Sequence, residues 1–343
     1  MDFLLEFAMF GLKVVVVVVG LVVFFGVLGS AAQRRRDKPQ TMQLFVRCIN
    51  SEVEGFRDAL NQSVLGTNEF KKLYKQRKKQ RKAEAKAKKK GKDEASPKKR
   101  MFVVDFKGDI DASRTENLRQ EITAILSQTR EDDEVLVRVE SAGGTVHGYG
   151  LAASQLTRIR NAQVFLTVAV DRVAASGGDL MAVVANQIIA APFALLGSIG
   201  VAAEVPNAHK LLSRFGVDYD VYTAGKHKRP VSFLAENTEE GTQKLKDDLL
   251  DVHGLFQEFI GGFRKEVDMQ RVSTGETWYG ERAKSLNLID RLMTSDEYLC
   301  DAIEETDIYH IRCEYPRKGL RQFQVAIQRA LAEVRSWMAG LIR

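Results

Sequence analysis

Short apolar strands alternate with helical segments from residue 101 onward, and this alternation constrains the fold more than any other feature of the chain. The segments MFVVDF, EVLVRVE and AQVFLTVAV have the composition of buried strands, and the segments between them have the apolar spacing of helices. Parallel strands need crossover helices of this kind to connect them. We therefore predict an α/β domain over residues 101–315, built on a parallel sheet with crossover helices.

Three further elements are expected within this domain. Ser113 is placed to cap a helix over residues 113–130, because its hydroxyl can accept a hydrogen bond from an early helical N–H. Residues 217–223, VDYDVYT, have the pattern of an apolar strand. Residues 239–270 are predicted to form one long helix.

A long apolar stretch inside the domain, residues 180–205, resembles a membrane span when it is taken alone. Asn186, Gln187 and Pro192 interrupt it, and no basic flank precedes it. We therefore expect a buried helix, a turn and a strand of the core.

The N-terminal segment 7–32 is apolar enough to cross a bilayer. It reads FAMFGLKVVVVVVGLVVFFGVLGSAA, with Lys13 as its one charge, and about twenty apolar residues span the hydrocarbon core. The tip before it is acidic and the run is long, unlike a cleavable signal peptide. We therefore expect residues 1–32 to be an uncleaved, single-pass anchor. The arginines at 34–36 indicate that the chain after the anchor is cytoplasmic.

Residues 33–100 are predicted to be a juxtamembrane segment and a basic linker. Positions 71–100 hold 16 Lys or Arg against 3 Asp or Glu. Such a block repels itself, so it stays open or frays as a helix. Lysines and arginines can neutralise nucleic-acid phosphates, but anionic lipid headgroups fit better beside a membrane anchor. We expect membrane lipid as a partner and no nucleic acid.

The C-terminal residues 316–343 are expected to form an amphipathic helix. One stripe of the segment is apolar and comprises Phe323, Ile327, Ala330, Val334, Trp337 and Leu341. Basic amphipathic helices commonly lie on membrane surfaces. A neighbouring subunit and the domain's own body are the alternative partners for this stripe.

Two glycine-rich turns follow predicted strands. In ESAGGTV, Gly143 and Gly144 end a strand and open a helix, where backbone N–H groups can bind an anion such as the oxyanion of acyl transfer. A simple strand-to-helix turn is the alternative. In AASGGDL, Ser176 is either an N-cap or a nucleophile with space around it, and the N–H of Gly177 would lie beside its hydroxyl.

A serine nucleophile needs a base. None of the five histidines lies in a motif typical of a Ser-His-Asp triad. The segment YTAGKHKRPVS offers Lys226, His227 and Lys228, and a lysine in its neutral form can accept the serine proton. A basic surface turn is the alternative for this segment. The three cysteines lack CxxC spacing, so we expect neither a disulfide framework nor a metal site.

Together with STGETWYGERAKSLNLIDRL, these segments resemble the signal peptide peptidase A family. The single anchor, basic linker and one protease unit are similar to its SohB branch. The resemblance implies a fold shared with Clp protease and crotonase, and a Ser-Lys dyad of Ser176 and Lys228. It assigns the oxyanion hole to Gly143, Gly144 and Gly177. ESAGG departs from the NSPGG common in the family, because this loop lacks the proline. Arg229-Pro230 after the lysine is also a departure, and it leaves Lys226 as the alternative base.

The same resemblance implies a serine endopeptidase of the bacterial inner membrane that needs no cofactor. Its expected substrates are signal peptides or misfolded membrane and envelope proteins, and its expected assembly is a ring-like homo-oligomer whose dyad is shared between subunits. Family members often have the domain on the outer face, whereas the arginines indicate the cytoplasm. Two alternatives are an acyl-CoA enzyme of the crotonase fold and a membrane scaffold without activity.

Overall fold

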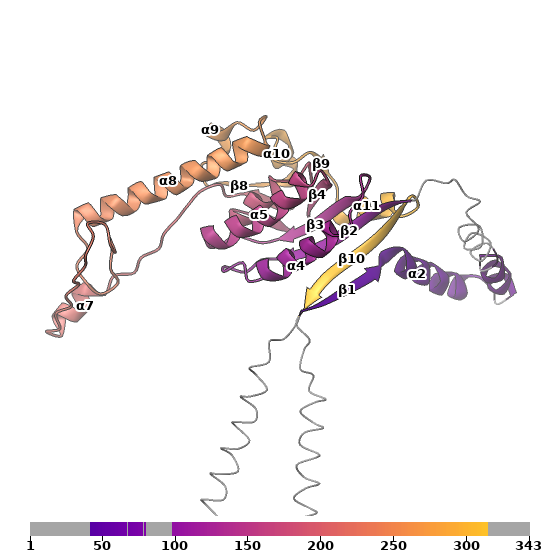
Figure 1. Ribbon diagram of the computed structural model, residues 1–343, viewed down its shortest axis with the longest axis horizontal. Coiled ribbons are helices and arrows are strands. Elements are labelled where there is room, and N and C mark those ends of the chain that lie inside the picture. The colour runs from indigo at the N-terminus through magenta and orange to yellow at the C-terminus, as the bar shows by residue number, and fades with distance from the viewer. Residues whose placement is uncertain (1–41, 67, 78, 80–97, 315–343) are drawn as a thin grey trace, which may run out of the picture. The chain divides into compact units, whose positions relative to one another are not determined.

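The computed structural model describes residues 42–66, 68–77, 79 and 98–314 (Figure 1). The expected anchor over 1–32, much of the basic linker and the expected C-terminal helix 316–343 lie outside the described residues. Residues 68–77, at the start of the basic block, are helical. No helix in the described part of the chain combines the length and the apolar character needed to cross a bilayer.

A seven-stranded sheet forms the centre of the domain. Its order is β1-β10-β2-β3-β4-β6-β9, and the pairs from β10 to β9 are all parallel. The strands in this order are Gln43–Cys48, Thr306–Glu314, Lys99–Lys107, Glu134–Glu140, Phe165–Val170, Gln187–Ala190 and Arg291–Leu292. The prediction of an α/β fold with a parallel sheet is therefore confirmed.

Both faces of this sheet are buried, which explains the continuous apolar runs in the sequence. Along β2, Phe102, Val104 and Phe106 point into the larger core, and Met101 and Val103 point into the smaller core on the other face. Period-2 alternation in a strand separates these two sets.

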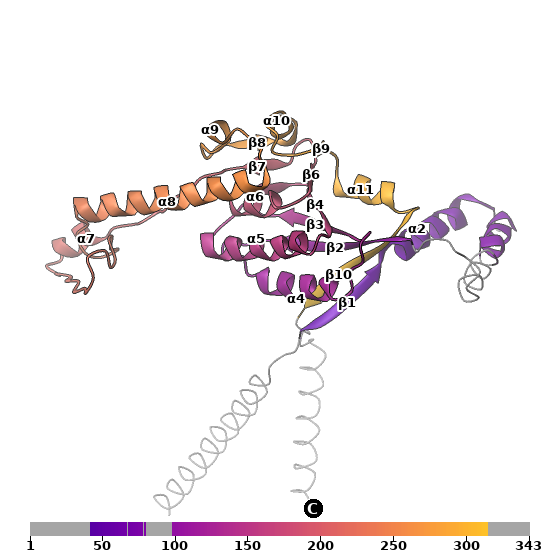
Figure 2. The same cartoon turned by 45° about the horizontal axis from the view of Figure 1, so that its top comes forward.

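Helices cover both faces of the sheet (Figures 1 and 2). The helices α4 (Thr115–Leu126), α5 (Val146–Asn161) and α6 (Gly177–Ala182) contribute to the larger core, and α11 (Ser295–Ala302) contributes to the smaller one. Figure 2 shows α4 and α5 side by side. The helix α2 (Ile49–Val64) is tied to the domain at its first turn, because the Asn50 amide donates to the carbonyls of Ile303 and Thr306 at 3.0 and 2.8 Å.

A second, three-stranded sheet consists of β5 (Val173–Ala175), β7 (Leu195–Gly197) and β8 (Thr277–Tyr279). Its first strand meets the carboxyl end of β3. The Ser141 N–H donates to the Val173 carbonyl at 2.9 Å, and the Ala175 N–H donates to the Ser141 carbonyl at 3.0 Å. These two bonds bring the loop after β3 against the turn after β5.

A long arm leaves the domain after β7 and returns along one helix. It contains α7 (His209–Arg214) and α8 (Glu239–Phe263), and two short helices follow, α9 (Met269–Val272) and α10 (Gly280–Ser285). The predicted long helix is confirmed, although it ends at Phe263. The Thr238 side chain caps it by accepting a hydrogen bond from the Gly241 N–H at 3.0 Å.

Two local predictions are wrong. Residues 217–223 form no strand and are exposed, because no strand edge in the described part of the chain pairs with them. Ser113 does not cap α4, because Asp109 accepts from both its N–H and its hydroxyl, at 2.8 and 2.6 Å. Such local side-chain bonds compete with capping.

Most of the apolar stretch 180–205 belongs to the core, as predicted, although residues 202–205 are exposed. It runs from the last part of α6 through β6 and β7, and it forms no long helix. Ile188, Ile189 and Leu196 are fully buried within it.

The packing of Tyr149 on Gly177 generates a stability prediction. A Cβ on Gly177 would lie 2.3 Å from Cγ of Tyr149, which is fully buried. The Tyr149 hydroxyl is also held, since it donates to the Asp109 carbonyl at 2.7 Å and lies 2.5 Å from the Ser141 hydroxyl. Because the ring cannot move aside, Gly177→Ala is expected to lower the free energy of unfolding by about 1–3 kcal/mol, measured by urea unfolding.

Gly254→Ala is the matched control, because a Cβ at this position in α8 would meet nothing within 4 Å. It is expected to leave stability unchanged or to raise it by about 0.5–1 kcal/mol, since alanine favours a helix over glycine. Equal stabilities of the two variants would contradict the account of this contact.

Candidate active site

Ser176 lies in a strained turn between β5 and α6. Its φ of 51° and ψ of −116° are rare for a residue other than glycine. Its N–H donates to the Gly197 carbonyl at 2.7 Å, and its carbonyl accepts from the Leu180 N–H at 2.9 Å. Its hydroxyl makes no capping bond to α6. The N-cap interpretation of this hydroxyl is therefore wrong.

The loop that contains Gly143 packs directly on this turn. A Cβ on Gly143, whose φ is +93°, would lie 2.7 Å from Cβ of Ser176 and 2.9 Å from the nitrogen of Gly177. Only glycine fits there. The N–H of Gly143 itself donates to the Ser141 hydroxyl at 3.0 Å.

Two backbone donors beside Ser176 remain available. Gly177 is the first residue of α6, where an N–H has no acceptor within its own helix. Among the described residues, the N–H of Gly144 also has no hydrogen-bond acceptor. The structure therefore brings the three predicted oxyanion-hole glycines together. Among them, Gly144 and Gly177 have free N–H groups in the described part of the chain, and Gly143 does not.

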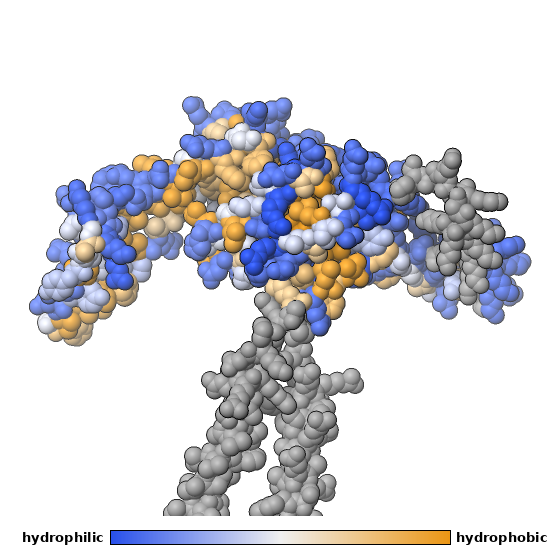
Figure 3. Space-filling model, in the orientation of Figure 1, coloured by the Kyte–Doolittle hydropathy of each residue, from blue (hydrophilic) through white to orange (hydrophobic). Residues whose placement is uncertain are grey.

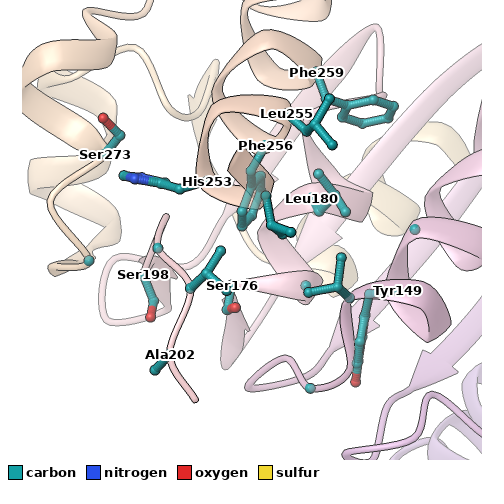
Figure 4. Close-up of a pocket in the computed structure, with 18 of the residues that line it drawn as sticks. Tyr149, Ser176, Leu180, Ser198, Ala202, His253, Leu255, Phe256, Phe259 and Ser273 are labelled. Atoms are coloured by element: carbon teal, nitrogen blue, oxygen red, sulfur yellow. The ribbon is translucent and has the colours of Figure 1, made fainter. Parts of the chain in front are cut away.

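Ser176, Gly144 and Gly177 line a cavity of about 1020 Å³. Residues from α5, α6, α8 and the segments 198–202 and 273–275 complete its wall. Figure 4 shows its two parts. Its apolar part includes Leu180, Leu255, Phe256 and Phe259, and its polar part includes Ser198, His253 and Ser273.

Lys228 does not line this cavity. It lies on the exposed arm before α8. Pro230, two residues later, contacts Gly241 near the start of that helix through its carbonyl oxygen. The first residue of α8 to line the cavity is Val252. At 1.5 Å per residue, Gly241 and Val252 are about 16 Å apart along the helix axis. The structure therefore does not bring Lys228 to Ser176 within one chain.

The two lysines of the predicted base segment differ in their contacts. Lys226 forms an exposed ion pair with Glu240 at 3.4 Å. Within the part of the chain that the structure describes, the Lys228 side chain has no hydrogen-bond or ion-pair partner. This difference favours Lys228 as the lysine that is free to act elsewhere.

Two histidines, His147 and His253, line the cavity and were missed by the sequence analysis. The analysis looked for triad motifs, whereas His253 reaches the cavity through the helical spacing of α8, which also brings Phe256 and Phe259 to it. No group of three or more His, Cys, Asp or Glu side chains among the described residues could hold a metal ion.

Asp179 is buried directly beneath the Ser176 turn, with 1% of its surface exposed. Its Oδ1 accepts from the Gly197 N–H at 3.4 Å, and its Oδ2 has no partner in the described residues. Burial raises the pKa of Asp179 to about 7, against the opposing effects of the Gly197 N–H and the Arg264 charge. Gly197 also accepts from the Ser176 N–H, so one residue links the carboxyl group to the turn.

Comparison with known proteins identifies the family of the chain. The family model described as "Peptidase family S49 N-terminal" matches residues 2–156, and that of "Peptidase family S49" matches residues 158–308. The chain belongs to peptidase family S49. This membership confirms the resemblance to the signal peptide peptidase A family, and relatives named probable protease SohB confirm the SohB branch.

Relatives of this S49 chain include bacterial proteins named probable protease SohB. The one from Haemophilus influenzae is 41% identical over 327 residues, which cover 94% of this chain and 92% of the relative. The one from Buchnera aphidicola subsp. Schlechtendalia chinensis is 41% identical over 306 residues, which cover 87% and 99%. A solved structure of a 1510-N membrane-bound stomatin-specific protease mutant with a substrate peptide is 13% identical, with a TM-score of 0.42, and covers 63% of this chain and 93% of that one.

Asp179 generates a prediction on stability and pH. Its folded pKa is raised from 3.8 to about 7, so the folded chain holds this proton more tightly than the unfolded chain does. Stability is therefore lost as pH rises from about 4 to about 7. Asp179→Asn removes this ionisation, so the variant does not lose this stability as pH rises. Its free energy of unfolding minus that of wild type is therefore expected to be larger at pH 8 than at pH 5, by roughly 2–4 kcal/mol.

Thermal or urea unfolding of both proteins at the two pH values measures this difference. Asp251→Asn, on the exposed side of α8, is the control and is expected to show no change of the difference with pH. The same stability difference between Asp179→Asn and wild type at pH 5 and pH 8 would contradict the assignment.

Proposed function

We propose that this S49 chain is a membrane-anchored serine endopeptidase in which Ser176 is the nucleophile and Lys228 is the general base. One observation carries the proposal. The Ser176 hydroxyl caps no helix, although it lies in a strained turn beside two free backbone N–H groups and faces a large cavity. Strain of this kind is commonly stored at functional sites.

In the proposed mechanism, peptide hydrolysis proceeds through an acyl-enzyme formed on Ser176. A substrate peptide lies extended beside the Gly143 loop, and neutral Lys228 accepts the Ser176 proton as Oγ attacks the scissile carbonyl. The N–H groups of Gly144 and Gly177 stabilise the oxyanion. The C–N bond then breaks, the leaving amine takes the proton from Lys228, and a water activated by the same lysine hydrolyses the acyl-enzyme.

We further propose that the two members of the dyad come from adjacent copies in a ring-like homo-oligomer. Within one chain Lys228 lies away from the cavity, on an arm whose apolar side chains are left exposed by the residues that the structure describes (Figure 3). The exposed apolar residues of the arm are Val205, Leu211, Phe215, Val217, Tyr219, Val221, Tyr222 and Phe233. Exposed apolar patches of this kind mark interaction sites, and a second copy is the common partner.

The rest of the chain is assigned on the sequence alone. We propose an anchor over residues 1–32, a juxtamembrane segment and basic linker over 33–100, the peptidase domain over 101–315 and an amphipathic helix over 316–343. The relatives support a bacterial protein, and the proposed anchor would hold it in the inner membrane. Signal peptides and misfolded membrane or envelope proteins are the proposed substrates, and anionic lipid is the proposed partner of the linker.

The acyl-CoA alternative receives no support from the family models, both of which describe peptidases. An inactive scaffold is disfavoured because the nucleophile, its strained turn and its free N–H groups are all present.

Complementation between two inactive variants tests the dyad. Ser176→Ala and Lys228→Ala are each expected to lose hydrolysis of a signal-peptide mimic by at least about 10³-fold. Lys226→Ala is the matched control and is expected to remain active, because Lys226 pairs with Glu240 instead. After subunit exchange between the two inactive proteins, part of the activity is expected to return, since some neighbouring pairs then hold both wild-type groups.

Differently tagged copies that purify together show that mixed oligomers have formed. Background activity in such mixed oligomers would contradict a dyad shared between subunits. Near wild-type activity of Ser176→Ala alone would contradict the nucleophile itself.

A further inference from the structure

The polar part of the cavity contains a histidine that the proposed reaction does not use. His253 projects from α8 toward Ser273, on the side of the cavity where Ser198 also lies (Figure 4). The apolar side chains Leu255, Phe256 and Phe259 of the same helix line the remainder of the cavity. His253 is therefore the one polar side chain among the described residues of α8 that line the cavity.

A chain of hydrogen bonds behind the ring fixes the direction of each donor. The Ser273 hydroxyl lies 2.5 Å from the Met269 carbonyl oxygen, so its one proton is donated there. Its oxygen can then only accept, and the Gln257 Nε2 donates to it at 2.8 Å. This requirement also fixes the Gln257 amide, because its oxygen in the same place would face another acceptor.

The fixed amide determines which nitrogen of His253 carries the proton. The Gln257 Nε2 also lies 3.5 Å from the His253 Nε2, so its second N–H is the donor available to that ring nitrogen. An imidazole nitrogen that faces a donor must accept, so the neutral ring carries its proton on Nδ1. Within the described residues, this Nδ1–H has no hydrogen-bond partner.

We propose that His253 is a specificity-determining residue of the substrate groove, whose Nδ1–H donates to an oxygen of a substrate side chain. The acceptor is the amide oxygen of Gln or Asn, or the carboxylate of Glu or Asp. An apolar residue at the same substrate position offers this donor no acceptor, which weakens binding relative to a residue that supplies one. The inference rests on the proposed function, because it describes how a peptide is selected at the same site.

The tautomer is tested without any activity measurement. Full-length protein in detergent is labelled with ¹⁵N in its histidine rings, and the signal that disappears in His253→Leu identifies His253 among the five histidines. At pH 8 the spectrum is expected to show a neutral ring protonated on Nδ1. A ring protonated on Nε2 would overturn the hydrogen-bond chain and the inference with it.

Selection is tested with sets of three peptides that differ at a single position, which carries Leu, Gln or Glu. One such set is made for each position on either side of the cleaved bond. At one of these positions wild type is expected to prefer Gln or Glu over Leu by about tenfold in kcat/KM. The Gln and Glu peptides distinguish an amide from a carboxylate acceptor. His253→Leu is expected to remove this preference, so that the polar and Leu peptides have similar kcat/KM values.

Gln257→Leu removes the donor that fixes the ring, so it is expected to reduce the same ratio. Gln243→Leu is its matched control, because Gln243 is exposed on the same helix and, among the described residues, its side chain bonds to Asp247 alone. Equal rates for all peptides in wild type, or an unchanged ratio in His253→Leu, would overturn the role of His253 alone. If wild type hydrolyses none of the peptides, the proposed function fails and the role of His253 fails with it.

Discussion

The loop after β3 lies against the turn after β5, and the chemistry of the cavity depends on how closely these two segments approach. Two backbone bonds between Ser141 and β5 set their register. Gly143 then allows the loop to touch Ser176, while Tyr149 closes the space behind Gly177. Because a side chain at either glycine would force these segments apart, the contact holds both the strained φ of Ser176 and the free N–H groups beside it.

The sequence predicts those parts of the fold whose residues are buried on both sides or have a strong helical period. The central parallel strands, α5 and α8 are of this kind, and Ser176 and its glycines follow from their place between strands and helices. The edge strand β1 was not predicted, because its sequence QLFVRC does not alternate between apolar and polar residues. Its residues Leu44, Phe45 and Val46 are all exposed. The segment 217–223 alternates like a strand but has no strand edge beside it in the described residues.

The remaining parts of the site depend on contacts between residues distant in sequence. Asp179 reads as an ordinary acidic residue early in a helix, and only its burial against Gly197 raises its pKa. The role inferred for His253 depends on Ser273, twenty positions later, and on the orientation of one amide between them. Lys228 lies on an arm whose apolar side chains are exposed among the described residues, and this position is likewise a property of tertiary structure. It is why we assign the base to a neighbouring copy.

The most direct test of the central claim is whether Ser176 forms a covalent bond with a reagent specific for activated serine hydroxyls. A fluorophosphonate loses fluoride when such a hydroxyl attacks its phosphorus, so the adduct increases the mass of the peptide that contains the serine. Peptide mapping by mass spectrometry is expected to place the adduct on Ser176, with none in Lys228→Ala protein, where the base is missing. Labelling at another serine, or labelling that persists in Ser176→Ala protein, would contradict the assignment of Ser176 as the nucleophile.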